Sequence, residues 1–132
     1  MARVKYFVNE SRGDSGSIRA RSTEDLEAGT VVFISGVRSS NLYVSKADAQ
    51  YSKKSTGLLF VAPNRVASGK SQQFVTFLIV PFTGDATDGD TIYLTKNGKW
   101  GLKKTKTAQP IGKILGGRPD ELHALIAPQG QY

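Results

Sequence analysis

Three short segments of this 132-residue chain occur twice, in the same order. The pairs are AGTVVFIS at residues 28–35 and DGDTIYLT at 88–95, TGLLFV at 56–61 and IGKILG at 111–116, and LIVP at 78–81 and LIAP at 125–128. One such match would carry little weight, but three in order indicate a duplicated unit of about 50–60 residues. In this alignment Gly29 is equivalent to Gly89, and Pro81 is equivalent to Pro128.

All three repeated elements have the composition of β-strands. Val, Ile, Phe and Tyr dominate them, and Gly, Asn, Asp and Pro bound them. The Asn97-Gly98 pair between TIYLT and WGLKK predicts a hairpin. Residues 119–125 could begin a helix at Pro119, but ELHALIAP aligns with FVTFLIVP in the repeat, so we expect a strand there. The sequence therefore predicts an all-β domain, a small barrel built from a duplicated β unit.

Three of the predicted strands are apolar without interruption, at residues 31–34, 58–61 and 77–80. A half-buried strand alternates apolar and polar residues, whereas a continuous apolar run is typical of a strand covered on both faces. A small barrel has only one interior. The second face must then meet another layer, a long loop or another subunit, and we interpret it as evidence for an oligomer.

The chain is basic, with a formal net charge of +7. Residues 1–21 contain five basic and two acidic residues, and residues 96–118 contain seven basic residues and no acidic one. Such asymmetry favours acidic partners, either nucleic acid or an acidic protein surface, although a solvated face is the alternative. Because NESRGDSGS is rich in Ser, Gly and charge and precedes the duplicated unit, we predict an extended arm over residues 1–21 and a β domain over 22–132.

Residues with obvious chemistry are scarce. There is no cysteine, and His123 is the single histidine. No Walker or dinucleotide-type glycine loop occurs, and the acidic stretch at 85–90 is better explained as a turn than as a calcium loop. Trp100, next to Lys99, is more easily explained as cover for the end of a core than as a stacking platform for a base. We therefore expect no enzymatic activity, no cofactor and no metal.

The sequence also bears on compartment. The longest apolar stretch, residues 74–82, is about half the length that a transmembrane helix needs. The N-terminus has no apolar region of the signal-peptide type. We expect a soluble protein without a signal peptide, and the lack of cysteine fits assembly in a reducing cytosol.

Several stretches, in order through residues 26–129, resemble tailed-phage head decoration proteins, also called capsid cement proteins. They are LEAGTVVFIS at 26–35, VSKADAQ at 44–50 with STGLLFVA at 55–62, GDATDGDTIYLTKNGKW at 84–100, AQPIGKILGG at 108–117 and LHALIAPQ at 122–129. The resemblance implies β-barrel or β-tulip subunits, usually homotrimers, made in the host cytoplasm and bound to the outer surface of the phage head. There they bridge neighbouring major capsid proteins, with no catalysis, no cofactor and no membrane.

The resemblance also implies a role for the arm, which in this family commonly reaches across the shell. Candidate capsid-binding residues in the arm are Arg3, Lys5, Tyr6, Phe7, Arg12, Arg19 and Arg21. A secondary basic patch comprises Lys99, Trp100, Lys103, Lys104 and Lys106. In a trimer, three weak attachment sites would act at high effective concentration and give durable binding.

Two alternatives remain open at the level of sequence. The first is a basic β-barrel that binds nucleic acid, which the positive charge and Trp100 favour. Its affinity for nucleic acid would fall steeply as the salt concentration rises. The second is a glycan-binding head fibre module, in which Tyr43, Tyr51 and Trp100 would stack on sugars. Binding of nucleic acid is the less expected of the partner classes.

Overall fold

The computed structural model describes residues 17–55, 57–118 and 121–130, and this part of the chain is almost entirely β-structure. The strands are β1 Ser17–Ser22, β2 Val31–Arg38, β3 Asn41–Lys46, β4 Leu59–Val61, β5 Ser71–Val75, β6 Leu78–Phe82, β7 Thr91–Leu94, β8 Trp100–Gly101, β9 Gln109–Arg118 and β10 Glu121–Ile126. One turn of 3-10 helix, η1, spans Ser52–Lys54. Nothing helical in the described ranges has the length to cross a bilayer. The all-β prediction is confirmed.

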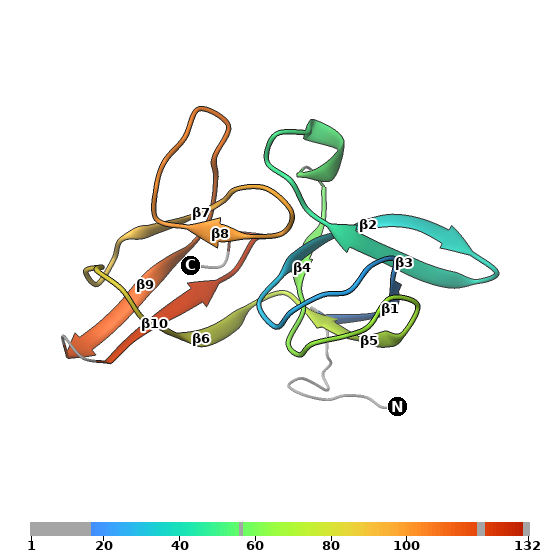
Figure 1. Cartoon of the computed structure of the whole chain (residues 1–132), viewed down its shortest axis with the longest axis horizontal. Helices are drawn as coiled ribbons and strands as arrows, with labels where there is room; N and C mark the ends of the chain where they lie inside the picture. Colours follow the sequence, from blue (N-terminus) through green and yellow to red (C-terminus); the bar gives the residue numbers. More distant parts are fainter. Residues whose placement is uncertain (1–16, 56, 119–120, 131–132) are drawn as a thin grey trace.

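The ten strands form two sheets that lie side by side (Figure 1). Strands β1 to β5 close into a barrel with the order β1-β3-β2-β4-β5, in which β5 returns to pair with β1. Strands β6 to β10 form a curled, open sheet with the order β6-β10-β9-β7-β8. Each sheet is therefore made by a continuous half of the described chain.

The two sheets are versions of one unit, which confirms the duplication at Gly29 and Gly89. The pairings β2–β4, β4–β5 and β5–β1 in the barrel reappear as β7–β9, β9–β10 and β10–β6. Gly29 N–H donates to the Ala62 carbonyl at 2.7 Å, and Gly89 N–H donates to the Ile114 carbonyl at 2.8 Å. The two units differ in closure. The first is closed because β1 pairs with β3, whereas in the described second unit the corresponding strands β6 and β8 do not pair.

The third repeated element was aligned wrongly from the sequence. LIVP lies in β6, the first strand of the second unit, whereas LIAP begins in β10, the last strand of that unit. The two segments are antiparallel neighbours, with Leu78 opposite Ile126. Pro81 and Pro128 are consequently not equivalent. The strand expected near residue 121 is present as β10. The counterpart of β6 is instead β1, because Phe82 at the end of β6 precedes Gly89 by seven positions, just as Ser22 at the end of β1 precedes Gly29.

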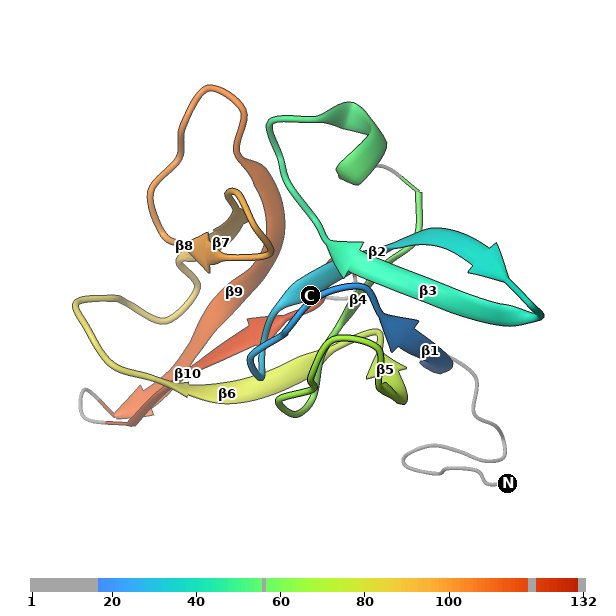
Figure 2. The same ribbon diagram turned by 45° about the vertical axis from the view of Figure 1, so that its right-hand side comes forward.

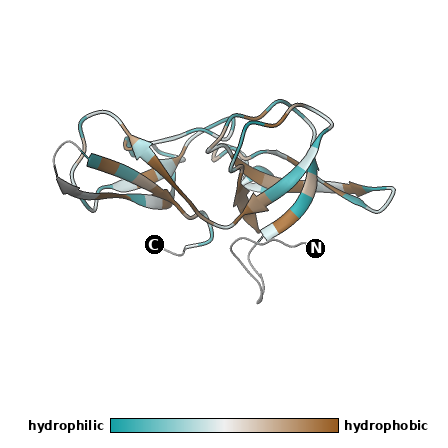
Figure 3. Cartoon of the chain, turned by 90° about the horizontal axis from the view of Figure 1, so that it is seen from below, coloured by the Kyte–Doolittle hydropathy of each residue, from teal (hydrophilic) through white to brown (hydrophobic). Residues whose placement is uncertain are grey.

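The apolar runs in β2 and β4 are explained by two cores that share these strands. Val32 and Phe60 point into the barrel interior, where Phe74 and Leu26 are also buried. The intervening residues face the open sheet. Their cluster comprises Val31, Ala47, Leu59 and Val61 from the barrel and Ile92, Leu94, Ile111, Ile114, Ala124 and Ile126 from the open sheet. Figure 3 shows hydrophobic residues along the strands of both sheets.

The outer wall of the closed unit therefore fills the concave face of the open one. Each fully buried aliphatic side chain contributes about 1.5–3 kcal/mol to stability, so this shared cluster ties the two sheets into one folding unit. The second layer that the runs at 31–34 and 58–61 require is supplied by the same chain. These two runs consequently give no support to the inferred oligomer.

The predicted boundary of the N-terminal arm needs a correction. Residues 17–21 belong to β1, which pairs with β5 over five residues and with β3, and Ala20 is buried in the barrel core. The strand forms because Ile18 and Ala20 alternate with polar residues and present one apolar face to the interior. The barrel domain thus begins at least as early as Ser17, and residues 1–16 lie outside the described part of the chain.

Candidate attachment surfaces

Two lysine-rich segments lie on one side of the molecule. One is segment 47–58 between β3 and β4, and the other is segment 95–108 on either side of β8. In two views that differ by 45°, the loop that carries η1 and the loop after β8 project from the same long side, one above each sheet (Figures 1 and 2). Together they carry seven exposed lysines, which we name the lysine face: Lys53, Lys54, Lys96, Lys99, Lys103, Lys104 and Lys106.

Asp48 fixes the two loops to each other. Its carboxylate accepts hydrogen bonds from the backbone N–H groups of Gln50, at 3.0 Å, and Asn97, at 3.4 Å. Close by, Ala49 N–H donates to the Thr95 carbonyl at 2.7 Å. Asp48 is only 7% exposed, so its charge is largely withdrawn from the surface. These bonds fix segment 47–50 relative to the turn at 95–98, which carries Lys96.

The lysine face accounts for nearly all of the excess positive charge. Its seven lysines and the one acid of the two loops, Asp48, give +6 of the formal +7. The other eleven basic and ten acidic residues give the remaining +1. Sequence reasoning found the part at 96–106 but missed Lys53 and Lys54, because about forty residues separate the two loops along the chain and only the folded structure brings segment 47–49 against the turn at 95–98.

The structure places the five residues of the predicted basic patch within and on either side of β8. Lys99, Lys103, Lys104 and Lys106 are exposed, whereas Trp100 is half-buried and packs against the core between the sheets. Its indole Nε1 donates a hydrogen bond to the Gly29 carbonyl at 3.0 Å. The side chain links the open sheet to the barrel, as expected of a residue that covers the end of a core.

Five of the seven predicted arm residues precede the described part of the chain. Arg3, Lys5, Tyr6, Phe7 and Arg12 lie outside the described residues, and their capsid-binding role stays a prediction. The remaining two are barrel residues that reach across to neighbouring backbone or side chains. Arg21 donates to the Gly69 carbonyl at 3.1 Å, and Arg19 donates to Ser71 Oγ at 3.5 Å.

The aromatic residues proposed for sugar stacking belong to three different elements, with Tyr43 in β3, Tyr51 before η1 and Trp100 in β8. Tyr51 is 55% exposed in the loop before η1, with Lys54 Nζ at 5.1 Å from its ring centroid. Tyr43 is half-buried in β3, and the Arg38 guanidinium lies 5.5 Å from its ring centroid. Both rings already have a cation over one face, which contributes to orienting those basic side chains.

The acidic stretch at 85–90 behaves as a turn. Asp90 accepts a hydrogen bond from the Thr87 N–H at 2.9 Å, and Asp88 accepts one from the Gly116 N–H at 3.0 Å. The described residues contain no group of three or more His, Cys, Asp or Glu side chains arranged to hold a metal. His123 is exposed on β10, opposite Pro81.

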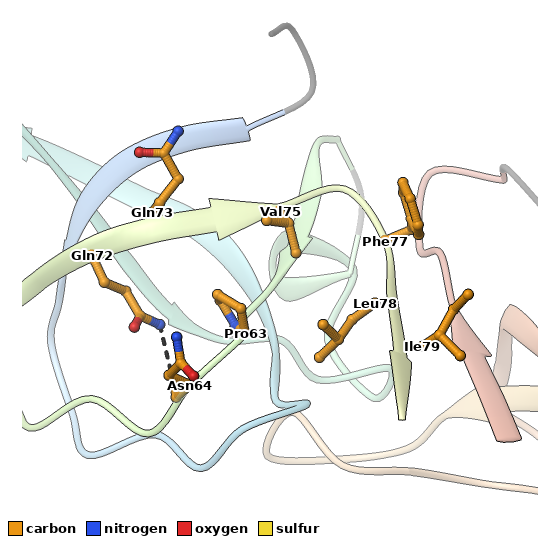
Figure 4. A pocket seen from close by; sticks show the side chains of 8 residues that line it. All are labelled: Pro63, Asn64, Gln72, Gln73, Val75, Phe77, Leu78 and Ile79. Atoms are coloured by element: carbon orange, nitrogen blue, oxygen red, sulfur yellow. Dashed lines mark hydrogen bonds between the residues drawn. The ribbon is translucent and has the colours of Figure 1, made fainter. Parts of the chain in front are cut away.

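A second surface of interest is a groove of about 520 Å³ between β6 and the barrel. It is lined by Pro63, Asn64, Gln72, Gln73, Val75, Phe77, Leu78 and Ile79 (Figure 4). Phe77 and Ile79 are each 50% exposed. The third apolar run of the sequence therefore remains partly uncovered in the described structure, unlike the runs in β2 and β4.

Comparison with known proteins identifies a structural relative but no family. The chain matches no protein-family model and no curated protein sequence. Among solved structures, it is similar to the N base of head fibre gp8.5 of bacteriophage phi29, with a TM-score of 0.54 and 17% sequence identity. The match covers 85% of this chain and 93% of the other. At this identity the similarity shows that the two proteins share a fold.

Proposed function

We propose that this protein is a structural component of a tailed-phage head, a decoration protein that binds the outer surface and stabilises the shell by bridging major capsid proteins. The observation that carries the proposal is the fold, which is shared over most of both chains with the base of a phage head fibre. The resemblance of residues 26–129 to capsid cement proteins points to the same part of the virion.

The lysine face is the proposed attachment surface. It concentrates six net positive charges on segments 47–58 and 95–108, and the hydrogen bonds of Asp48 hold segment 47–50 and the turn at 95–98 in place before binding, which lowers the ordering entropy lost there. Complementary charge accelerates association and selects partners, and exposed pairs weaken as salt screens them over about 10 Å at 0.1 M. The partner of this chemistry is an acidic region of the major capsid protein.

Stabilisation follows from attachment across joints between capsid subunits. A bound protein that contacts two neighbours must detach from one of them before the joint can open. In the proposed homotrimer three copies of the lysine face act at high effective concentration, so contacts that are weak alone sum to durable binding. This mechanism requires neither a reaction nor a cofactor.

The test is binding to undecorated heads, followed by heating. The natural chain should sediment with heads and raise the temperature at which they release DNA. A variant with Lys103→Glu and Lys104→Glu should bind at least tenfold more weakly at 0.1 M salt. The control, Arg38→Glu with Lys70→Glu, makes the same change of charge on other surfaces and should bind normally. If undecorated heads bind neither the natural chain nor the Lys103→Glu, Lys104→Glu variant, the proposal is refuted.

A second candidate is favoured by the same structural match, namely that the domain is the base of a head fibre. A fibre base would belong to a polypeptide that continues into a projecting part, whereas a cement protein would be on the head as a chain of 14.3 kDa. Mass spectrometry of the polypeptide extracted from natural heads distinguishes the two. A substantially heavier polypeptide would favour the fibre base.

A further inference from the structure

The outer face of β6 carries apolar residues where the equivalent strand of the barrel carries charged ones. Because β6 is the counterpart of β1 and follows it by sixty positions, Ile79 corresponds to Arg19 and Pro81 corresponds to Arg21. Ile79 is 50% exposed, and Pro81 is exposed as well. Two versions of one unit therefore differ at the same two outward positions, which are charged in the barrel and apolar in the open sheet.

The neighbouring strand repeats this difference. In the barrel, Gln73 and Ser71 of β5 lie opposite the two arginines of β1, so all four side chains are polar. In the open sheet, Leu125 and His123 of β10 lie opposite the two corresponding residues of β6. We name this surface the β6–β10 face after its four residues, Ile79, Pro81, His123 and Leu125. It contains no arginine, lysine or carboxylate, unlike its counterpart on the barrel.

The apolar run at 77–80 is covered by the described chain on its inner face. Leu78 and Val80 pack on the core between the sheets. In Figure 4, Leu78 and Ile79 point to opposite sides of β6. Phe77, at the start of the run, is 50% exposed and lines the groove beside the barrel, so apolar surface continues from the β6–β10 face to that groove. A continuous apolar run is typical of a strand covered on both faces, and contiguous exposed apolar surface marks an interaction site.

The distribution of charge favours a second copy of this chain as the partner. The lysine face projects from one long side of the molecule, and β6 runs along the opposite side in both views (Figures 1 and 2). Two copies can therefore meet through their β6–β10 faces while their lysine faces stay apart. Charges of both signs flank the β6–β10 face, with Lys113 opposite Leu125 and Glu121 at the start of β10, so its border is suited to meeting its own copy. An acidic partner would instead gain its charge pairs at the lysine face.

We propose that copies of this chain associate through the β6–β10 face, with Phe77 beside it. The outer residues of the run at 77–80 then gain the cover that a strand apolar on both faces requires. An interface core of this kind is depleted in charged residues, as the cores of protein–protein interfaces are. The inference deepens the proposed function, and it rests on that function for the role of the homotrimer at the head.

Replacing the face by its barrel equivalents tests the proposal in the purified protein. The natural chain should sediment as an oligomer at micromolar concentration. The variant Ile79→Arg with Leu125→Gln carries the residues that the barrel has at these positions, and it should associate at least about tenfold more weakly, because association would bury an unpaired guanidinium. The control, Val37→Arg with Leu58→Gln, makes a similar exchange at residues 65% and 59% exposed and should associate normally. A monomeric natural chain, or equal association of the two variants, would overturn the proposal.

Thiol reactivity locates the interface without adding a charge, because the natural chain has no cysteine. The thiol of Ile79→Cys should react with a thiol reagent about tenfold more slowly in the oligomer than after dilution to monomers, since the reagent reaches it only in the dissociated form. The thiol of Val37→Cys, on the β2–β3 hairpin, should react at the same rate at both concentrations. Equal behaviour of the two variants would contradict the proposal. Neither measurement involves heads, so self-association can fail here while head binding succeeds, and the reverse.

Discussion

At the scale of single residues, two glycines show how tightly the second unit is assembled. A Cβ at Gly112 in β9 would overlap the Leu125 carbonyl oxygen of β10. Gly98, with φ of +72°, lies against Thr30 and the Val31 carbonyl of the barrel. Both positions require the absence of a side chain because backbone, which cannot rotate away, occupies the space.

Gly112→Ala should accordingly lower the free energy of unfolding by about 3 kcal/mol, since the β9–β10 pair must separate to admit the methyl group. Gly101→Ala, in β8, adds the same methyl group where nothing lies within 4 Å and is the control. Urea denaturation measures both. Similar midpoints for the two variants would show that the β9–β10 contact is looser than described.

Trp100→Phe distinguishes a structural role from a binding role for this residue. Phe keeps most of the packing but loses the Nε1 hydrogen bond to the Gly29 carbonyl, which costs about 1 kcal/mol of stability. Head binding under conditions where the variant is folded should be unchanged. A strong loss of binding with unchanged stability would instead place the indole on a ligand.

At the scale of secondary-structure elements, β4 shows how one short strand serves two cores. Leu59 and Val61 face the open sheet, and Phe60 between them faces the barrel interior. Because β4 lies in the wall that the two units share, a destabilising substitution in β4 should lower the stability of both units. The chain is then expected to unfold in one cooperative transition rather than as two domains.

Adjacent leucines provide a matched test of this shared wall. Leu59→Ala removes a fully buried side chain and should cost about 2–5 kcal/mol, while Leu58→Ala, at a residue 59% exposed, should change stability by less than about 0.5 kcal/mol. Chemical shifts of β2 and of β9 should report the same midpoint in Leu59→Ala. Separate transitions would mean that the two sheets fold independently.

Truncation tests the barrel boundary at the same scale. A chain that starts at Ser22 lacks nearly all of β1 and should fail to form the closed barrel, because β3 and β5 each lose a partner. A chain that starts at Ser17 keeps β1 and should retain the barrel. Near-ultraviolet circular dichroism and amide spectra separate the two cases. A folded chain from Ser22 would restore the longer arm inferred from sequence.

Local features were predictable from sequence, and long-range ones were not. The hairpin at Asn97-Gly98 could be predicted from the sequence, because both residues adopt positive φ, of 56° and 72°, which few other residue pairs allow. The alignment of LIVP with LIAP failed because an apolar strand ending in Pro suits both the first and the last strand of a unit. The contact between segment 47–49 and the turn at 95–98, which brings two distant lysine-bearing segments together, depends on the buried Asp48 and on backbone hydrogen bonds that no local pattern reveals.

At the scale of the whole molecule, charge and apolar surface are separated. The lysine face occupies the side of the molecule that carries the loops before β4, β8 and β9, and the apolar groove lies beside β6. The fold itself is the union of a closed barrel with an open copy of the same unit, filled by the outer wall of the barrel. The proposed function follows this division, with the lysine-bearing loops binding the head.

Electron cryo-microscopy of decorated heads tests the central claim most directly. We predict density for the barrel and open sheet on the outer surface of the shell, with the loops at 47–58 and 95–108 directed at acidic residues of at least two capsid subunits. Density inside the head, or loops 47–58 and 95–108 directed to solvent, would contradict the account.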